Sequence, residues 1–181
     1  MQRLAALLIV LLLAIEPACA QFPAKPRRQA PEKPVEKASV MINGQAISPG
    51  HVFQELLGAA GPPDHVQAVR SKEVANDYVL FAYDSLGVTA HITVVNNTNN
   101  VVSAIVVKDA RVKIDNVPFK VGDDYRGIAE IWGQPDRQEP GFVAYWKRGV
   151  YVGVGEDGRI TNITIAEPGK FDDQTPAAKN G

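Results

Sequence analysis

One pattern of sixteen residues constrains the fold more than any other, because the chain contains it twice. Residues 121–136 read VGDDYRGIAEIWGQPD, which predicts a short amphipathic helix that ends at a glycine and leaves through a proline-containing turn. Residues 49–64 read PGHVFQELLGAAGPPD and align with it at an offset of 72 positions, which places Gly133 over Gly61. Agreement in both helix periodicity and turn glycine predicts a duplicated structural unit.

Both predicted helices carry one apolar face, with apolar residues at spacings of three, four and seven. The faces consist of Phe53, Leu56, Leu57 and Ala60 in the first copy and of Tyr125, Ile128, Ala129 and Trp132 in the second. In the first copy we expect Ser48 to cap the helix and Pro49 to occupy its first position. Gly58 or Gly61 is expected to end it, and the two prolines that follow prevent its continuation.

Runs of β-prone residues follow each helix. In the first copy they are residues 78–83, 88–94 and 101–107, after a variable segment at 65–77; the second copy repeats their order with a shorter variable segment. Each copy is therefore expected to hold a strand or short hairpin, a helix and a three-stranded antiparallel meander. The predicted fold class is α+β, with two tandem repeats at residues 39–108 and 109–166 and both helices on one side of the sheet.

The amino terminus has the pattern of a secretory signal peptide. A basic residue, Arg3, precedes an apolar run at residues 4–15, and Ala18-Cys19-Ala20 is a small-x-small cleavage site. The run is too short to span a bilayer, so cleavage near Ala20 would release a periplasmic or secreted product without a transmembrane anchor. Lipidation of Cys19 is the alternative, although Glu16 and Pro17 do not fit a lipoprotein signal. Cys19 is the only cysteine, so the released product would have none.

The segments at the two ends of the duplicated region differ from it in composition. Residues 21–38 are rich in proline and carry five basic residues against two acidic ones, which predicts a solvated linker. Weak contact of this linker with an anionic envelope polymer is a possible function. Residues 167–181 have no periodicity and are predicted to be a disordered tail.

The residues of the second pattern resemble a known family. Gly122-Asp123-Asp124, Gly127-Ile128 and Trp132-Gly133-Gln134-Pro135-Asp136, followed by a meander, resemble the repeat of the small lipoprotein of the outer-membrane β-barrel assembly machinery. In tandem, the units are similar to the secreted β-lactamase inhibitory protein, and the closest category is an uncharacterised family of exported bacterial proteins. The resemblance covers residues 40–166. It implies an absence of catalysis and protein binding through the exposed sheet face and loops.

The chain departs from both named proteins. The assembly lipoprotein has a single repeat and a lipid anchor, whereas this chain has two copies and a poor lipidation signal. The inhibitory protein has disulfides within its repeats, and this chain has no cysteine after Cys19.

Motifs for catalysis or metal binding are weak in this sequence. Lysine and arginine together number 19 and aspartate and glutamate 20, a balance without the basic excess of a nucleic-acid-binding protein. The three histidines have no partner at metal-ligand spacing, so no metal or cofactor is expected. Asp64 beside His65 could form an acid–base pair, but Asp64 aligns with Asp136 while His65 aligns with Arg137, which favours a turn-capping role for the aspartates. Neither a phosphate-binding loop nor a nucleophile elbow occurs.

Strand parity points to a binding surface. If Val150, Val152 and Val154 face the helices, Tyr151 faces away, and so do Phe142 and Trp146 in the preceding strand; Leu80 and His91 occupy the same face in the first copy. Tryptophan and tyrosine concentrate binding energy at interfaces. The alternative is that these aromatic residues belong to the core.

These observations predict an exported, non-enzymatic module that binds another envelope or secreted protein. A small-ligand carrier or hydrolase using the cleft between the repeats, with Asp64, His65 and Glu73 as polar groups, is the alternative. A purely structural envelope protein, anchored by its basic linker, is a third possibility.

Overall fold

The computed structural model describes residues 36–70, 77–95 and 99–169 of the 181 residues. The predicted signal peptide, most of the linker, Glu73 and residues 170–181 of the tail therefore lie outside the described residues. Ala38, at the end of the predicted linker, is already buried in the main core.

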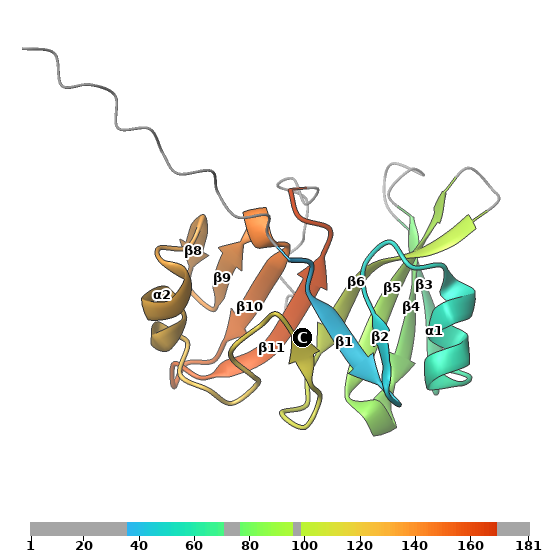
Figure 1. Cartoon of the computed structure of the whole chain (residues 1–181), viewed down its shortest axis with the longest axis horizontal. Coiled ribbons are helices and arrows are strands. Elements are labelled where there is room, and N and C mark those ends of the chain that lie inside the picture. The colour runs from blue at the N-terminus through green and yellow to red at the C-terminus, as the bar shows by residue number, and fades with distance from the viewer. Residues whose placement is uncertain (1–35, 71–76, 96–98, 170–181) are drawn as a thin grey trace, which may run out of the picture. The chain divides into compact units, whose positions relative to one another are not determined.

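The described chain is an antiparallel α+β structure (Figure 1). Its helices are α1 (Phe53–Ala60) and α2 (Arg126–Trp132), with short 3₁₀ turns η2 (Asp84–Leu86) and η3 (Trp146–Arg148). Its strands are β1 (Ser39–Ile42), β2 (Gln45–Ile47), β3 (His65–Val69), β4 (Tyr78–Tyr83), β5 (Val88–Val95), β6 (Asn99–Val107), β7 (Ile114–Asp115), β8 (Arg137–Glu139), β9 (Phe142–Tyr145), β10 (Val150–Val154) and β11 (Ile160–Ala166).

The described strands form two sheets. The larger is eight-stranded and antiparallel throughout, in the order β3-β4-β5-β6-β11-β10-β9-β8. Read from either edge, the chain runs as a meander toward the central β6–β11 pair. A smaller sheet, in the order β2-β1-β7, joins the segment before α1 to the segment before α2. Each half of the larger sheet thus holds four strands, where the sequence predicted a three-stranded meander.

The extra strand of the first half lies inside the predicted variable segment. His65–Val69 forms β3 because it pairs with β4 along its whole length, from His65 opposite Ala82 to Val69 opposite Tyr78. β8 holds the same edge position in the second half. All residues of these two strands except Val69 are exposed, so neither strand has the buried apolar face of a half-buried strand.

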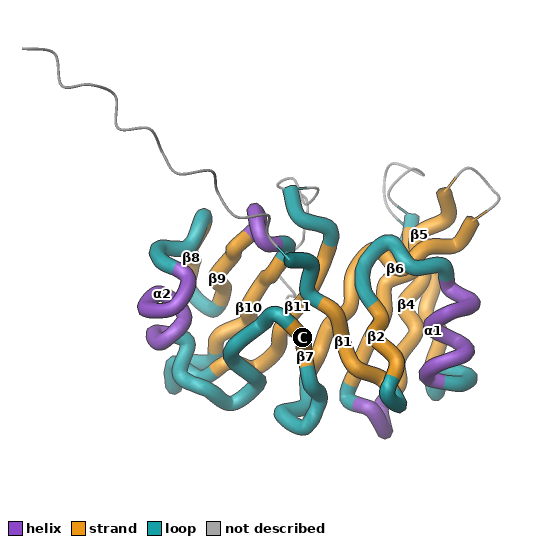
Figure 2. The backbone as a smooth tube through the Cα atoms, viewed as in Figure 1, coloured by secondary structure: helices purple, strands orange, loops and turns teal. Residues whose placement is uncertain are grey.

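Both helices pack on one face of the larger sheet, with β1 and β2 lying over that face between them (Figures 1 and 2). One buried cluster joins the layers: Leu56 of α1, Ile128 of α2 and Val40 of β1 meet the inward residues of the strands. The inward residues include Tyr83, Val88, Ala90, Ile105, Val143, Tyr145, Val150, Val152, Ile163 and Ile165. The strand parity expected for Val150, Val152 and Val154 agrees with this cluster: the first two are buried in it, and Val154 is partly buried and packs against it.

The start of α1 differs from the sequence prediction. Val52, not Ser48, precedes the first helical residue, and no side chain caps the helix. The segment after Ser48 and Pro49 pairs with β6 instead of starting the helix. The Gly50 N–H donates to the carbonyl of Val102 on β6, and the Val102 N–H donates to the carbonyl of His51. These two backbone bonds keep the chain extended until Val52, and the helix begins only afterwards.

Both helices end at the predicted glycines with nearly the same backbone geometry. Gly61 has φ 78° and ψ −165°, and Gly133 has φ 80° and ψ −168°. Their N–H groups donate to the carbonyls of Leu57 and Ala129, at 2.9 and 3.0 Å. A side chain at such a positive φ is strained, so glycine is required where the chain turns from helix to strand.

Candidate functional site

The face of the larger sheet opposite the helices, called the outer face below, carries a small cluster of its own. Tyr151, Ala104, Ala144 and Ala166 are buried there, and Phe142 packs against them. Cross-strand pairing produces the cluster, because Tyr151 of β10 lies directly opposite Ala144 of β9. The predicted orientation of Phe142 and Tyr151, away from the helices, agrees with this cluster.

Tyr151 is much less accessible than a residue on a bare sheet face. Only 7% of it is exposed, and its ring stacks on Phe142 at 6.2 Å between centroids, with 23° between the ring planes. Burial raises the pKa of Tyr151 to about 12, with a further contribution from the nearby Asp136 carboxylate. The hydroxyl therefore stays protonated at neutral pH.

Trp146 lies outside the strand to which the sequence analysis assigned it. β9 ends at Tyr145, and Trp146 opens the 3₁₀ turn η3, so strand alternation does not decide its orientation. It is 40% exposed, and few other large apolar residues of the described chain are as accessible. The Gly169 N–H donates to its carbonyl at 3.0 Å, which ties the start of the predicted tail to this turn.

Leu80 and His91 lie on the same face in the first half, directly opposite each other on β4 and β5. Both are partly buried. His91 stacks on Tyr78 with ring centroids 5.1 Å apart and planes 2° from parallel. Tyr78 was not predicted as a site residue; its position diagonal to His91 across the pair could have suggested the contact once the β4–β5 register was known.

The environment of His91 suppresses its charge. Desolvation and, less strongly, the positive charge of Lys108 lower its pKa to about 4. The imidazole is therefore neutral at physiological pH and packs as an aromatic ring against Tyr78.

The two aspartates at the helix exits have the turn-capping role that their alignment favoured. Asp64 accepts a hydrogen bond from the backbone N–H of Asp84 in η2 at 2.8 Å, and Asp136 accepts one from Lys147 in η3 at 3.2 Å. His65 contacts the carboxylate of Asp84, with 3.1 Å between Nε2 and Oδ2, and both side chains are well exposed.

This position weakens the cleft-based alternative, since His65 lies on edge strand β3. Strands β4, β5 and β6 separate it from the junction of the two halves. The third group of that alternative, Glu73, lies outside the described residues.

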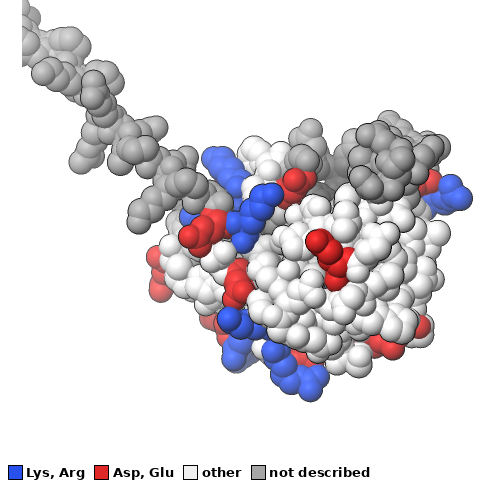
Figure 3. Space-filling model, turned by 45° about the vertical axis from the view of Figure 1, so that its right-hand side comes forward, with Lys and Arg blue, Asp and Glu red and all other residues white. Residues whose placement is uncertain are grey.

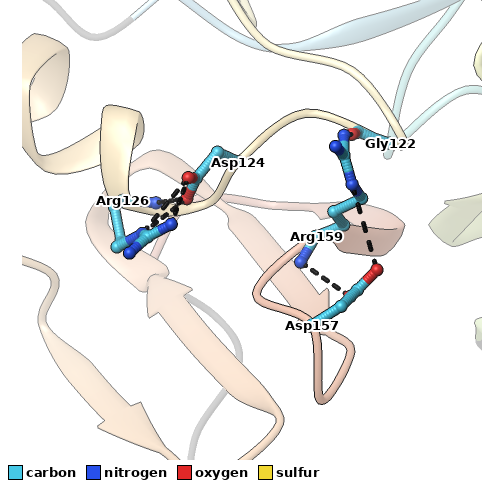
Figure 4. A network of polar contacts seen from close by, with 5 residues as sticks. All are labelled: Gly122, Asp124, Arg126, Asp157 and Arg159. Carbon is cyan, nitrogen blue, oxygen red and sulfur yellow. Dashed lines mark hydrogen bonds and ion pairs between the residues drawn. The ribbon is translucent and has the colours of Figure 1, made fainter.

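An open groove of about 820 Å³ lies beside α2, between the β8–β9 and β10–β11 turns. Polar contacts hold the loops beside this groove in place (Figure 4). Arg159 donates through Nη1 to the carbonyl of Gly122 at 2.8 Å, and Arg126 donates to both carboxylate oxygens of Asp124. Hydrogen bonds from Arg126 lower the pKa of Asp124 to about 2. Asp124 is thus held ionised and does not exchange a proton near neutral pH.

The aspartate pair at residues 123 and 124 lies in the turn before α2, and the first turn of α2 itself has no acidic residue. Asp124 accepts from the Arg126 N–H at 3.0 Å, and Asp123 accepts from the Lys120 N–H at 2.9 Å. The aspartates still have a structural role in positioning the start of the helix.

The described residues contain no group of three or more histidine, cysteine, aspartate or glutamate side chains placed to hold a metal ion. Within the same residues, neither helix is long and apolar enough to cross a membrane. Comparison of the chain with protein-family models, with curated proteins and with solved structures found no match.

Proposed function

We propose that this protein is an exported, non-enzymatic module that binds another envelope or secreted protein through the outer face of its larger sheet. The observation that carries the proposal is the arrangement of layers: both helices pack on the other face, while on the outer face Phe142 lies partly exposed over the buried Tyr151, and Trp146 lies exposed in the turn after β9. Aromatic side chains that bury large areas at little cost in entropy are the usual anchors of a protein interface.

Export is proposed from the sequence. The basic start, apolar run and Ala18-Cys19-Ala20 site favour cleavage near Ala20 and a periplasmic or secreted product. The balance of charges disfavours nucleic acid as the partner. The partner that the surface suits is a protein with a complementary apolar patch.

We further propose that the two halves are tandem repeats, as in the families that the sequence resembles. Three paired features support this. The strand order is the same from both edges to the β6–β11 junction, Gly61 matches Gly133 in backbone angles, and Gly87 (φ 64°, ψ 30°) matches Gly149 (φ 68°, ψ 27°) after the 3₁₀ turns. Duplication accounts for the scaffold, so the differences between the halves are where the binding function is expected.

The experiment that tests the binding proposal compares two exposed apolar residues. Trp146→Ala should reduce the partner protein recovered by affinity capture from the native envelope at least about tenfold, the loss typical of an interface anchor. Ile131→Ala, on α2 and 58% exposed, should leave capture unchanged because it lies on the opposite layer. Since both residues are exposed, both variants should keep the thermal midpoint of the parent.

Equal capture by the parent and by Trp146→Ala would exclude this turn from the binding surface. Loss of capture together with a large fall in the thermal midpoint would place Trp146 in the packing of the fold, and the proposal would then have to be abandoned for this residue.

A further inference from the structure

The two edges of the eight-stranded sheet are protected to different degrees. At one edge, β8 has three residues, two of which form the Arg137–Glu139 ion pair, and Pro140 follows directly. Short length, charge and proline are the features that keep an edge strand from pairing with another chain. At the other edge, β3 has five residues, HVQAV, with neither proline nor a lysine, arginine, aspartate or glutamate.

The β3 edge is also open and apolar. Val66 is 59% exposed, the largest exposed fraction among the large apolar residues of the described chain. On the side of the molecule where α1 lies, Figure 3 shows few charged side chains among uncharged ones. An exposed, uncharged edge strand is a template for main-chain pairing with another strand.

We propose that β3 pairs antiparallel with β3 of a second copy of this chain, about a two-fold axis through Gln67. In this register Val66 lies opposite Ala68 of the other copy. The residues flanking the strand favour a second copy of the same chain as the partner. Asp64 of each copy then lies opposite Arg70 of the other, which gives one such pair at each end of the interface. The edge is therefore complementary in charge to itself.

The charged groups are available for this contact. Arg70 is 83% exposed and donates one hydrogen bond to Asp77 at 2.9 Å, which leaves other donors of its guanidinium for a second carboxylate. Asp64 is exposed and accepts the Asp84 N–H through Oδ2, so its other oxygen can accept from Arg70. Residues directly opposite in antiparallel strands have Cβ atoms about 5 Å apart. Asp64 and Arg70 each lie one residue beyond an end of β3, and the long side chain of Arg70 can span the distance to a carboxylate there.

The pairing closes at two copies. A two-fold axis uses the same edge of both chains, and the remaining edge, β8, is the protected one. A five-residue strand buries less than the roughly 1,200 Å² of a standard interface, so we expect a dimer that forms at micromolar concentration.

Gln67→Cys tests the register. A cysteine on the two-fold axis faces its own copy at a Cα separation of about 4.5–5.5 Å, within the range that a disulfide spans. In the chain released after Ala20, or in a Cys19→Ala background, this variant should form a disulfide-linked dimer under mild oxidation. Val66→Cys alone should form far less, whereas a mixture of Val66→Cys and Ala68→Cys should form the mixed dimer.

Sedimentation of chains without introduced cysteine measures the dimer itself. Val66→Lys and Arg70→Glu should each weaken association at least about tenfold, because one places an unpaired charge at the centre of the strand pair and the other opposes two carboxylates. Ile131→Lys is the matched control, since Ile131 is 58% exposed but lies on α2, and it should associate like the parent.

Two results would overturn the proposal. One is a parent chain that stays monomeric up to about 1 mM, far above the micromolar range expected for this small interface; an edge that captures only a foreign strand would give this result. The other is equal cross-linking of Gln67→Cys and Val66→Cys. Neither result bears on the outer face, because β3 dimerisation does not rest on the proposed partner binding and the Trp146→Ala experiment can succeed in a monomer.

Discussion

Replacing Gly149 by alanine tests how the turn that presents Trp146 is held. Gly149 ends η3 in the left-handed region, at φ 68° and ψ 27°. It is held between its own turn and the end of β11, since its N–H donates to the Trp146 carbonyl at 3.0 Å and its carbonyl accepts from the Ala166 N–H at 2.7 Å. A Cβ atom at this position would collide with the carbonyl oxygen of Ala166 and lie 3.0 Å from the nitrogen of Pro168.

The cost has two parts. Holding alanine in the left-handed region costs about 1–2 kcal/mol. Relieving the collision means moving the backbone at the end of β11, because the contacted atom belongs to the main chain, and overpacking of this kind costs about 1–3 kcal/mol. Gly149→Ala should therefore lower the free energy of unfolding by about 3 kcal/mol, and the thermal midpoint by about 10 °C for a domain of this size.

Gly44→Ala separates the two parts. Gly44 also has a positive φ, 84°, but a Cβ atom there would meet nothing within 4 Å. This variant should lose only the conformational part, about 1–2 kcal/mol. Urea unfolding followed by circular dichroism measures both values. If the two variants were equally destabilised, the close approach of Gly149 to Ala166 would have no energetic effect, and the reasoning would be refuted.

Three further predictions concern the two faces of the larger sheet. Burial raises the pKa of Tyr151 from 10 to about 12, so its contribution to stability is complete below pH 10 and should be lost as pH rises to 12. In Tyr151→Phe the free energy of unfolding should depend less on pH over this range, and an unchanged dependence would count against the burial. For His91 the pKa shift has the opposite direction, from 6.5 in the unfolded chain to about 4 in the folded one, so only the unfolded chain binds a proton between these values. The free energy of unfolding should therefore decrease by up to about 3 kcal/mol as pH is lowered through this window, and His91→Gln should abolish this decrease in an acid titration. Leu56 of α1 is completely buried, so Leu56→Ala should cost about 2–5 kcal/mol in chemical denaturation, whereas Gln54→Ala, exposed on the same helix, should change stability by less than about 0.5 kcal/mol; comparable losses would mean that α1 does not pack as described.

The local elements were largely predictable from the sequence. The strand predicted at residues 78–83 is β4 as observed, Asn43 and Gly44 form the turn between β1 and β2 with positive φ angles, and Gly61 ends the first helix. Each of these features depends on a pattern within a few residues. Such patterns, of alternation or of glycine at a turn, act through local backbone sterics and burial.

The candidate site was predictable only in part. Alternation placed Tyr151 and Phe142 on the outer face, but it could not give the depth of their burial, which depends on what surrounds them in space. It also extended β9 through Trp146, which lies in a 3₁₀ turn because Gly149 reverses the chain immediately afterwards. Tyr78 against His91 and His65 against Asp84 are contacts across strands whose register the sequence does not specify.

By itself, the sequence determined the elements and their order: two amphipathic helices, the glycines that end them and the β-prone runs that follow. Only the tertiary structure decided that β3 and β8 are the outermost strands, that β6 joins β11 at the centre, and that α1 begins after Val52. The physical reason is the range of the interactions. Helix periodicity and turn conformation follow from neighbours along the chain, whereas edge strands and helix starts such as these are fixed by backbone hydrogen bonds between segments far apart in sequence, such as Gly50 to Val102.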